Sequence, residues 1–259
     1  MPREDVRPDS IYDTFDPEAP ETTEFRRIFT RIARHGEDEK LRSILFTSAE
    51  RGEGKTTCAS LFALVSCLHQ GLRTVLVDGD LHRPQISGLF ETPSSPGVRE
   101  ILLQRSPIEA CLHDTRHDSL KVIPAGGGEV PPSEVLVPDR LAAMFGKLRL
   151  LFDLVVVDAP PLLPVSDPSV IAREVDGVAL VVRAGRTQRD VAVRAQGILQ
   201  AAGGNGIGVI VNNVDDVLPY YYGHAYYGYS RTAGERRSEK RRRGRSRKVK
   251  EEPMKDPTA

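Results

Sequence analysis

The stretch TSAERGEGKTT, residues 47–57, lies between a short apolar run, SILFT, and an apolar pattern of helical spacing. Within it, Ala49, four further residues and then Gly54-Lys55-Thr56 fit a phosphate-binding loop, with alanine in place of the first glycine. Glycines let successive backbone N–H groups curl around phosphate oxygens, and the N-terminus of the next helix favours the same anion. A plain turn is the alternative, but the position between a strand and a helix favours a phosphate site.

The loop also provides side chains for a nucleotide and its metal. Lys55 is expected to reach the β- and γ-phosphates, and the Thr56 hydroxyl is expected to bind Mg²⁺. The loop residues expected to hold the nucleotide are Gly52, Glu53, Gly54, Lys55, Thr56 and Thr57.

Two later strands end in carboxylates. VLVDGD places Asp78 at a strand end and Asp80 two residues later, and DLVVVDAPP ends in Asp158. An aspartate at a strand end can simply form a turn. Mg²⁺, however, needs oxygen ligands beside the phosphates, and sites in open α/β sheets lie beyond the carboxyl ends of the strands. The three aspartates therefore predict a magnesium–nucleotide site.

Apolar runs and helical patterns alternate along the chain. The runs are expected to be buried strands at 43–47, 74–78, 120–124, 153–158, 177–182 and 206–211. Helices are expected at 57–70, closed by Gly71, at 140–152 and at 187–202, the last opening with a capping box of Thr187 and Asp190. This order predicts an α/β fold: a doubly wound, mostly parallel sheet flanked by helices, like that of P-loop NTPases.

Four segments follow from composition. Residues 1–22 are acidic and rich in proline and are predicted to be disordered; residues 23–217 form the P-loop domain. Residues 218–230, LPYYYGHAYYGYS, contain six of the seven tyrosines, and residues 231–259 form a basic tail that is predicted to be disordered. The tail holds 12 lysines and arginines against 5 acidic residues, although the whole chain has no net charge. Such segregation is typical of an interaction segment.

The composition is that of a globular protein of a reducing compartment. Of the 259 residues 39% are hydrophobic, and the three cysteines are in no metal-binding spacing; Cys58 and Cys67 lie in an apolar helical run, which favours core packing. No stretch is long and apolar enough to cross a membrane, and the acidic start does not fit a secretory signal. We therefore expect a cytoplasmic protein, and any connection to a membrane must come through a partner or through surface charge.

The motifs together resemble those of the bacterial tyrosine kinases (BY-kinases) of capsular and exopolysaccharide synthesis. The resemblance spans about residues 24–230. It rests on SAERGEGKTT, VLVDGDLHRP, IPAGGGEVPPSEVL, FDLVVVDAPPLLPVSD, GVALVVRAGRT, GVIVNNVD and the tyrosine cluster. It implies ATP as phosphoryl donor, Mg²⁺ as cofactor and, as activator, a membrane-spanning polysaccharide co-polymerase. A homo-oligomer and a phosphotyrosine phosphatase are the other implied partners.

The resemblance also implies roles for single residues. Asp78 is similar to the base or hydroxyl-positioning group, Asp80 and Asp158 to the magnesium carboxylates, and Asn212 to the asparagine beside adenine. The catalytic set is thus Lys55, Asp78, Asp80 and Asp158, with Thr56 as a further metal ligand. The phosphate acceptors implied are Tyr220, Tyr221, Tyr222, Tyr226, Tyr227 and Tyr229.

Two stretches depart from the pattern of the kinases. Ala49, Glu50 and Arg51 replace the usual start of the loop, and TEFRRIFTRI has Phe29 in place of an arginine of the helix that builds the kinase ring. Two other functions stay open: a non-catalytic ATP-binding regulator of the same machinery, and a positioning ATPase of the ParA/MinD kind. Glu50 argues against the second, since those proteins resemble a pattern with lysine there. For the basic tail a solvated segment and a membrane surface are both favoured over nucleic acid.

Overall fold

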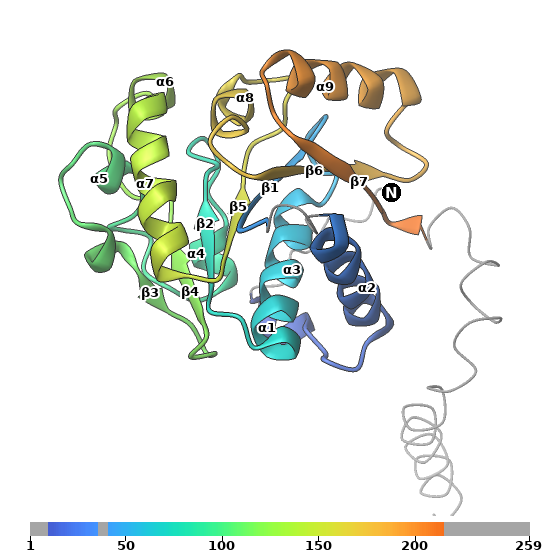
Figure 1. The fold of residues 1–259 in the computed structure, drawn as a ribbon, viewed down its shortest axis with the longest axis horizontal. Helices are drawn as coiled ribbons and strands as arrows, with labels where there is room; N and C mark the ends of the chain where they lie inside the picture. The colour runs from blue at the N-terminus through green and yellow to red at the C-terminus, as the bar shows by residue number, and fades with distance from the viewer. Residues whose placement is uncertain (1–9, 36–40, 215–259) are drawn as a thin grey trace, which may run out of the picture. The chain divides into compact units, whose positions relative to one another are not determined.

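The computed structural model describes residues 10–35 and 41–214. A seven-stranded sheet lies at its centre, in the order β3-β4-β2-β5-β1-β6-β7 (Figure 1). Neighbouring strands are parallel except β3, which pairs antiparallel with β4. The strands are β1 Ser43–Ser48, β2 Thr74–Asp78, β3 His113–Asp114, β4 Leu120–Ile123, β5 Leu154–Asp158, β6 Gly177–Arg183 and β7 Gly206–Asn212. The predicted fold class is confirmed, and the six predicted strands lie within one residue of their observed bounds.

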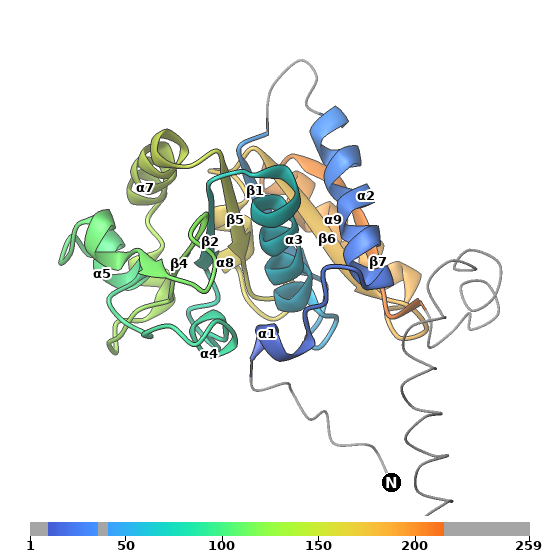
Figure 2. The same cartoon turned by 90° about the horizontal axis from the view of Figure 1, so that it is seen from below.

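Helices cover both faces of this sheet. They are α1 Ile11–Thr14, α2 Pro20–His35, α3 Lys55–Gln70, α4 Ile86–Leu89, α5 Val98–Leu102, the 3-10 helix η1 Ile108–Cys111, α6 Pro132–Val135, α7 Pro138–Leu151, α8 Asp167–Ile171 and α9 Arg189–Ala201. Helix α3 packs on β1, β2 and β5, with α2 beside it (Figure 2). Helix α7 contacts β5, and α9 contacts β7.

Two hydrophobic cores result, one on each face. In β1, Ile44 and Phe46 point into the core under α3, whereas Leu45 points into the core that contains α7 residues such as Phe145. This is the alternation that a strand imposes on successive side chains. Because both faces are covered, every residue of β1, β2 and β5 is buried. The two layers hold the carboxyl ends of these strands in fixed register.

The N-terminal segment is a correction to the prediction of disorder over residues 1–22. Residues 10–22 are part of the fold: Ile11 is 3% exposed, in the core under α3. The ring of Tyr12 meets that of Phe90 edge-on at 5.8 Å, and the guanidinium of Arg116 lies 4.4 Å above it. The prediction of disorder relied on the number of charged residues and prolines. It did not account for a few apolar and aromatic side chains that pack against residues far away in the sequence.

The three cysteines are buried, as the apolar pattern around two of them indicates. Burial raises the pKa of Cys58 to about 12 and that of Cys67 to about 11. Both thiols are therefore protonated near neutral pH and act as small apolar side chains.

Glu100, the central residue of α5, links two loops. Its carboxylate accepts the Gly97 N–H at 2.7 Å, the Gly127 N–H at 3.0 Å and the Ser95 hydroxyl at 3.2 Å. Partial burial alone raises the pKa of Glu100, but these hydrogen bonds outweigh burial and hold the pKa below its ordinary value. The charged carboxylate therefore stabilises the fold.

Replacing Glu100 by alanine is expected to lower the free energy of unfolding by about 1 to 2 kcal/mol at pH 7. Because the folded-state pKa is lowered, the contribution is present above the unfolded-state pKa and is lost as pH falls through the folded-state value. Urea unfolding should therefore show a smaller difference in the free energy of unfolding between wild type and Glu100→Ala in acid than at pH 7. Glu109→Ala, at an exposed position of η1, is the matched control; equal losses in both variants would contradict the role of Glu100.

Candidate nucleotide and phosphoryl-transfer site

The carboxyl ends of three adjacent strands bring the predicted aspartates together. In the ladder between β2 and β5, Asp78 pairs directly with Asp158, and Phe46 of β1 pairs with Asp158 from the other side. The phosphate loop follows β1, so it opens at the same edge of the sheet. Residues 80 positions apart in sequence are thus neighbours because parallel strands end together.

Lys55 lies among these carboxylates. Its ammonium donates to Asp80 Oδ2 at 3.2 Å and to the Thr56 hydroxyl at 3.1 Å, and it lies 3.6 Å from Asp158 Oδ1. Burial by itself lowers the pKa of Lys55, but the charges of Asp158 and Asp80 outweigh it and hold the pKa above its ordinary value. Lys55 therefore stays charged and offsets part of the buried negative charge.

Asp158 is almost completely buried. Its Oδ2 accepts the Thr56 hydroxyl at 2.7 Å, while its Oδ1 is buried with no hydrogen-bond partner. Burial raises the pKa of Asp158, although Lys55 acts in the opposite direction. A buried acceptor oxygen without a donor is costly, so this atom suits a cation or a bound water.

Asp78 is enclosed by backbone. Its Oδ2 accepts the N–H groups of Gln85 and Ile86, each at 3.0 Å, and its Oδ1 accepts that of Asp80 at 3.2 Å. Burial, and secondarily the charge of Asp158, raise the pKa of Asp78 to about 7. The side chain holds the loop after β2 in shape, and its role as base or positioning group stays a prediction.

These residues fit a magnesium ion that is shared with a nucleotide. In the described residues no cluster of three or more carboxylate, histidine or cysteine side chains could hold a metal alone. Magnesium usually takes only one or two protein carboxylates and completes its shell with phosphate oxygens and water. Asp158, whose Oδ1 has no hydrogen-bond partner, together with Asp80 and the Thr56 hydroxyl can supply that minimal set.

The buried side chain of Glu53 fixes the phosphate loop by hydrogen bonds. This side chain is 2% exposed; it accepts the Glu50 N–H at 2.7 Å and the hydroxyl of Thr187. Of the predicted nucleotide residues, Glu53 therefore turns its carboxylate into the protein and leaves only its backbone for phosphate.

Thr187 is a correction at the start of α9. The predicted capping box is wrong: α9 begins at Arg189, after Gln188, with no side-chain cap. The Thr187 hydroxyl instead accepts the Arg183 N–H at 2.9 Å and donates to Glu53. The Thr187 hydroxyl could either cap the helix or bond to Glu53, and in this structure it bonds to Glu53.

Asn212, at the end of β7, lies against the loop. Its amide donates to the Glu53 carbonyl at 3.0 Å. Gly54 has a φ of 91°, and a Cβ built on it would lie 2.0 Å from the Asn212 amide nitrogen, so only glycine fits. Asn212 is thus at the nucleotide loop, and its contact with adenine stays a prediction.

Thr57, another of the predicted nucleotide residues, is exposed in the first turn of α3.

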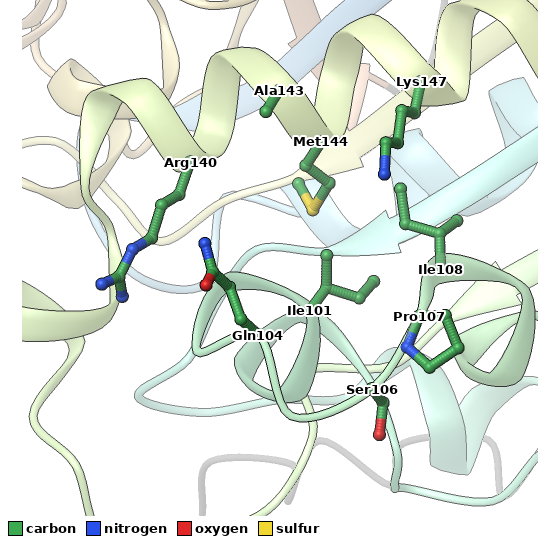
Figure 3. A pocket seen from close by; sticks show the side chains of 9 residues that line it. All are labelled: Ile101, Gln104, Ser106, Pro107, Ile108, Arg140, Ala143, Met144 and Lys147. Carbon is green, nitrogen blue, oxygen red and sulfur yellow. The ribbon is translucent and has the colours of Figure 1, made fainter.

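Two predicted features lie elsewhere. The six tyrosines, Tyr220, Tyr221, Tyr222, Tyr226, Tyr227 and Tyr229, lie outside the described residues, as does the basic tail. The chain divides into two units, 1–214 and 215–259, and the second lies wholly outside the described residues. A groove of about 370 Å³ between α5, η1 and α7 contains none of the predicted site residues (Figure 3).

No protein-family profile matches the chain, but individual proteins do. The tyrosine-protein kinase CpsD of Streptococcus agalactiae is 30% identical over 198 residues, 76% of this chain and 85% of that protein. The chain belongs to the bacterial tyrosine-protein kinase family. The putative tyrosine-protein kinase CapB of Staphylococcus aureus is 29% identical over 80% of this chain and 91% of CapB. The longer kinase wzc of Salmonella typhi is 30% identical, and the match covers 25% of wzc.

Solved structures agree with this assignment. The kinase domain of Escherichia coli tyrosine kinase ETK superposes with a TM-score of 0.74 at 26% identity, over 81% of this chain and 84% of that domain. The chimerical protein CapA2B2 gives 0.73, also at 26%, over 79% and 90%. The Pyrococcus furiosus cell division ATPase MinD, at 21% identity, 66% and 71% coverage and a TM-score of 0.57, shares the fold. The prediction of a tyrosine kinase with a P-loop nucleotide-binding fold is confirmed.

In the part of the chain that the structure describes, no helix is long and apolar enough to span a bilayer.

Proposed function

We propose that this tyrosine kinase transfers the γ-phosphoryl group of ATP to tyrosines of its own cluster, 220–229, in a neighbouring copy of the chain. The observation that carries the proposal is the convergence of Lys55, Thr56, Asp80 and Asp158 within hydrogen-bond or ion-pair distance at one sheet edge. Phosphoryl transfer needs positioning and charge stabilisation more than covalent chemistry, and this set provides both.

Each residue has a part in this reaction. Lys55 binds the β- and γ-phosphates, and the loop backbone over residues 52–57 orients them. Thr56, Asp80 and Asp158 hold Mg²⁺, which when bound neutralises charge on the phosphates. Asp78 orients or deprotonates the tyrosine hydroxyl, and Asn212 lies on the adenine side.

The end of β7 supports the cluster as substrate. Asn212 contacts the phosphate loop, so the chain leaves the described fold beside the site. The 8 to 17 residues from there to the tyrosines span at most ~25–60 Å when extended. This reach allows the site of the same copy or that of a neighbour, and the ring implied by the resemblance favours the neighbour.

The biological role follows from the relatives. We assign the kinase to the control of capsular or exopolysaccharide polymerisation and export. Its activator is the cytoplasmic segment of a membrane-spanning polysaccharide co-polymerase, which brings the kinase to the inner face of the membrane. A phosphotyrosine phosphatase reverses the modification. The wzc match, confined to a quarter of that relative, fits a kinase unit that other chains carry with additional segments.

Changing all six cluster tyrosines to phenylalanine is expected to abolish phosphotyrosine formation with Mg-ATP while leaving ATP affinity within about twofold of wild type. The measurement is an anti-phosphotyrosine blot beside nucleotide titration, with and without the co-polymerase segment. Tyr12→Phe is the control, because Tyr12 is packed against Phe90 and Arg116 and should not be an acceptor. Full labelling of the six-fold variant would refute the cluster as substrate.

A non-catalytic regulator is the second function to test. Such a protein would bind Mg-ATP, yet wild type would show no phosphotyrosine even with the activator segment present. A positioning ATPase would release phosphate without labelling the chain. The similarity to MinD extends to the fold alone, whereas the kinases match at higher identity.

A further inference from the structure

The turn after β6, residues 183–187, is built rigidly against the phosphate loop. The N–H groups of Arg186 and Thr187 donate to the Arg183 carbonyl at 3.2 and 3.0 Å. Gly185, with a φ of 69°, supplies the left-handed residue that this turn requires. Ala184 N–H donates to the Asn212 carbonyl at 2.9 Å, which fixes the turn to the end of β7.

The same turn is fixed to the loop itself through Thr187. The hydroxyl of Thr187 bridges the Arg183 N–H and the buried Glu53 carboxylate. Glu53 in turn holds the Glu50 N–H. The residue before Thr187 is therefore placed beside the phosphate loop by a chain of hydrogen bonds, and its position does not depend on a flexible connection.

That residue is Arg186, and its guanidinium lies over the loop. A Cβ built on Gly52 would be 3.5 Å from the Arg186 Nη1 atom, so the positive charge lies over the face of Gly52 that a side chain would otherwise cover. Arg186 is exposed, and no carboxylate within the described residues pairs with it. An arginine beside a phosphate-binding backbone that has no carboxylate partner can bind an anion such as a phosphate group.

The charge of the site supports this reading. Asp78, Asp80 and Asp158 lie beside the Lys55 ammonium, which is already engaged with Asp80 and Thr56. A nucleotide brings further negative charge, which the backbone N–H groups of the loop meet only with partial charges. A guanidinium makes strong, directional hydrogen bonds to phosphate oxygens.

We propose that Arg186 contacts the phosphates of the bound nucleotide and is a further phosphate-binding residue of this kinase. The inference rests on the proposed binding of ATP in the loop. Arg186 belongs to the stretch GVALVVRAGRT, and nothing in the pattern of the phosphate loop itself points to it. The signal that could have found it is its place just past the end of a strand next to β1.

The test is a titration of fluorescent ADP, and of a non-hydrolysable ATP analogue, into the full chain with Mg²⁺. Arg186→Gln is expected to weaken the affinity for both by about tenfold, as loss of a charge-assisted hydrogen bond does. Arg186→Lys, which keeps the charge, should recover part of it. Arg189→Gln, an exposed arginine three residues later, is the matched control and should bind as wild type.

Two further readings separate the possible failures. The thermal midpoint without nucleotide should be unchanged in Arg186→Gln; a lowered midpoint with equal losses in the glutamine and lysine variants would show a structural role and overturn the proposal. Unchanged affinity in Arg186→Gln, alongside a large loss in Lys55→Met, would overturn the role of Arg186 alone. Unchanged affinity in Lys55→Met would instead refute the loop as nucleotide site.

Discussion

Replacing Lys55 by methionine is expected to lower autophosphorylation by at least about a hundredfold and to destabilise the nucleotide-free protein by roughly 3 kcal/mol. Loss of activity follows from the loss of a fixed positive charge at the phosphates. Loss of stability follows from the carboxylates. With the ammonium gone, Asp80 and Asp158 remain buried beside each other without their counter-charge.

The two effects can be measured separately. Anti-phosphotyrosine blotting gives the activity, and urea unfolding at pH 7.5 gives the stability. Lys147→Met, an exposed lysine of α7, is the control for the loss of a charge. Lys55→Arg keeps the charge and should recover much of the stability but little activity, because the guanidinium differs in size and geometry from an ammonium. Activity in Lys55→Met near the wild-type level would contradict the assignment of the loop.

The stabilisation that Lys55 provides depends on pH in a direction set by its pKa. The folded-state pKa of Lys55 is raised, so its stabilising contribution is complete below the unfolded-state pKa and is lost only as pH rises through the folded-state value. The Lys55 ammonium therefore stays charged across neutral pH, and the stability gap between wild type and Lys55→Met should narrow as pH falls and the buried carboxylates of the variant take up protons.

Much of this site could be predicted because its parts are local. The loop from Gly52 to Thr57 is a contiguous pattern, and Asp78 and Asp158 each end an apolar run whose burial is readable from the residues around it. Parallel strands then bring those ends together without any knowledge of the loops between them.

The parts that could not be predicted depend on contacts across long separations. Glu53 meets Thr187 134 positions away, and this contact removes the helix cap that the local pattern indicates. Ile11 finds its partners in the core under α3, against the disorder that its charged neighbours indicate. The role that we propose for Arg186 follows from the position of its guanidinium beside Gly52, a contact between residues far apart in the sequence.

Asp158 raises a conflict between stability and function. The carboxylate is 1% exposed, burial raises its pKa, and its Oδ1 has no hydrogen-bond donor. A raised folded-state pKa of an acid means that stability falls as pH rises above the unfolded-state pKa, since the folded protein must then keep a buried charge. The nucleotide-free protein is thus strained at the atom that we assign to Mg²⁺.

Replacing Asp158 by asparagine is therefore expected to raise the free energy of unfolding of the nucleotide-free protein by about 1 kcal/mol at pH 8, while autophosphorylation falls by at least about a hundredfold. The amide keeps the shape and can still accept the Thr56 hydroxyl, but it brings no charge to a metal. The gain in stability should shrink as pH falls, because wild-type Asp158 then becomes protonated. Urea unfolding from pH 5 to 8 checks this, with exposed Asp190→Asn as the control. A variant that is less stable than wild type at pH 8 would show that pairing with Lys55 outweighs the cost of burying Asp158.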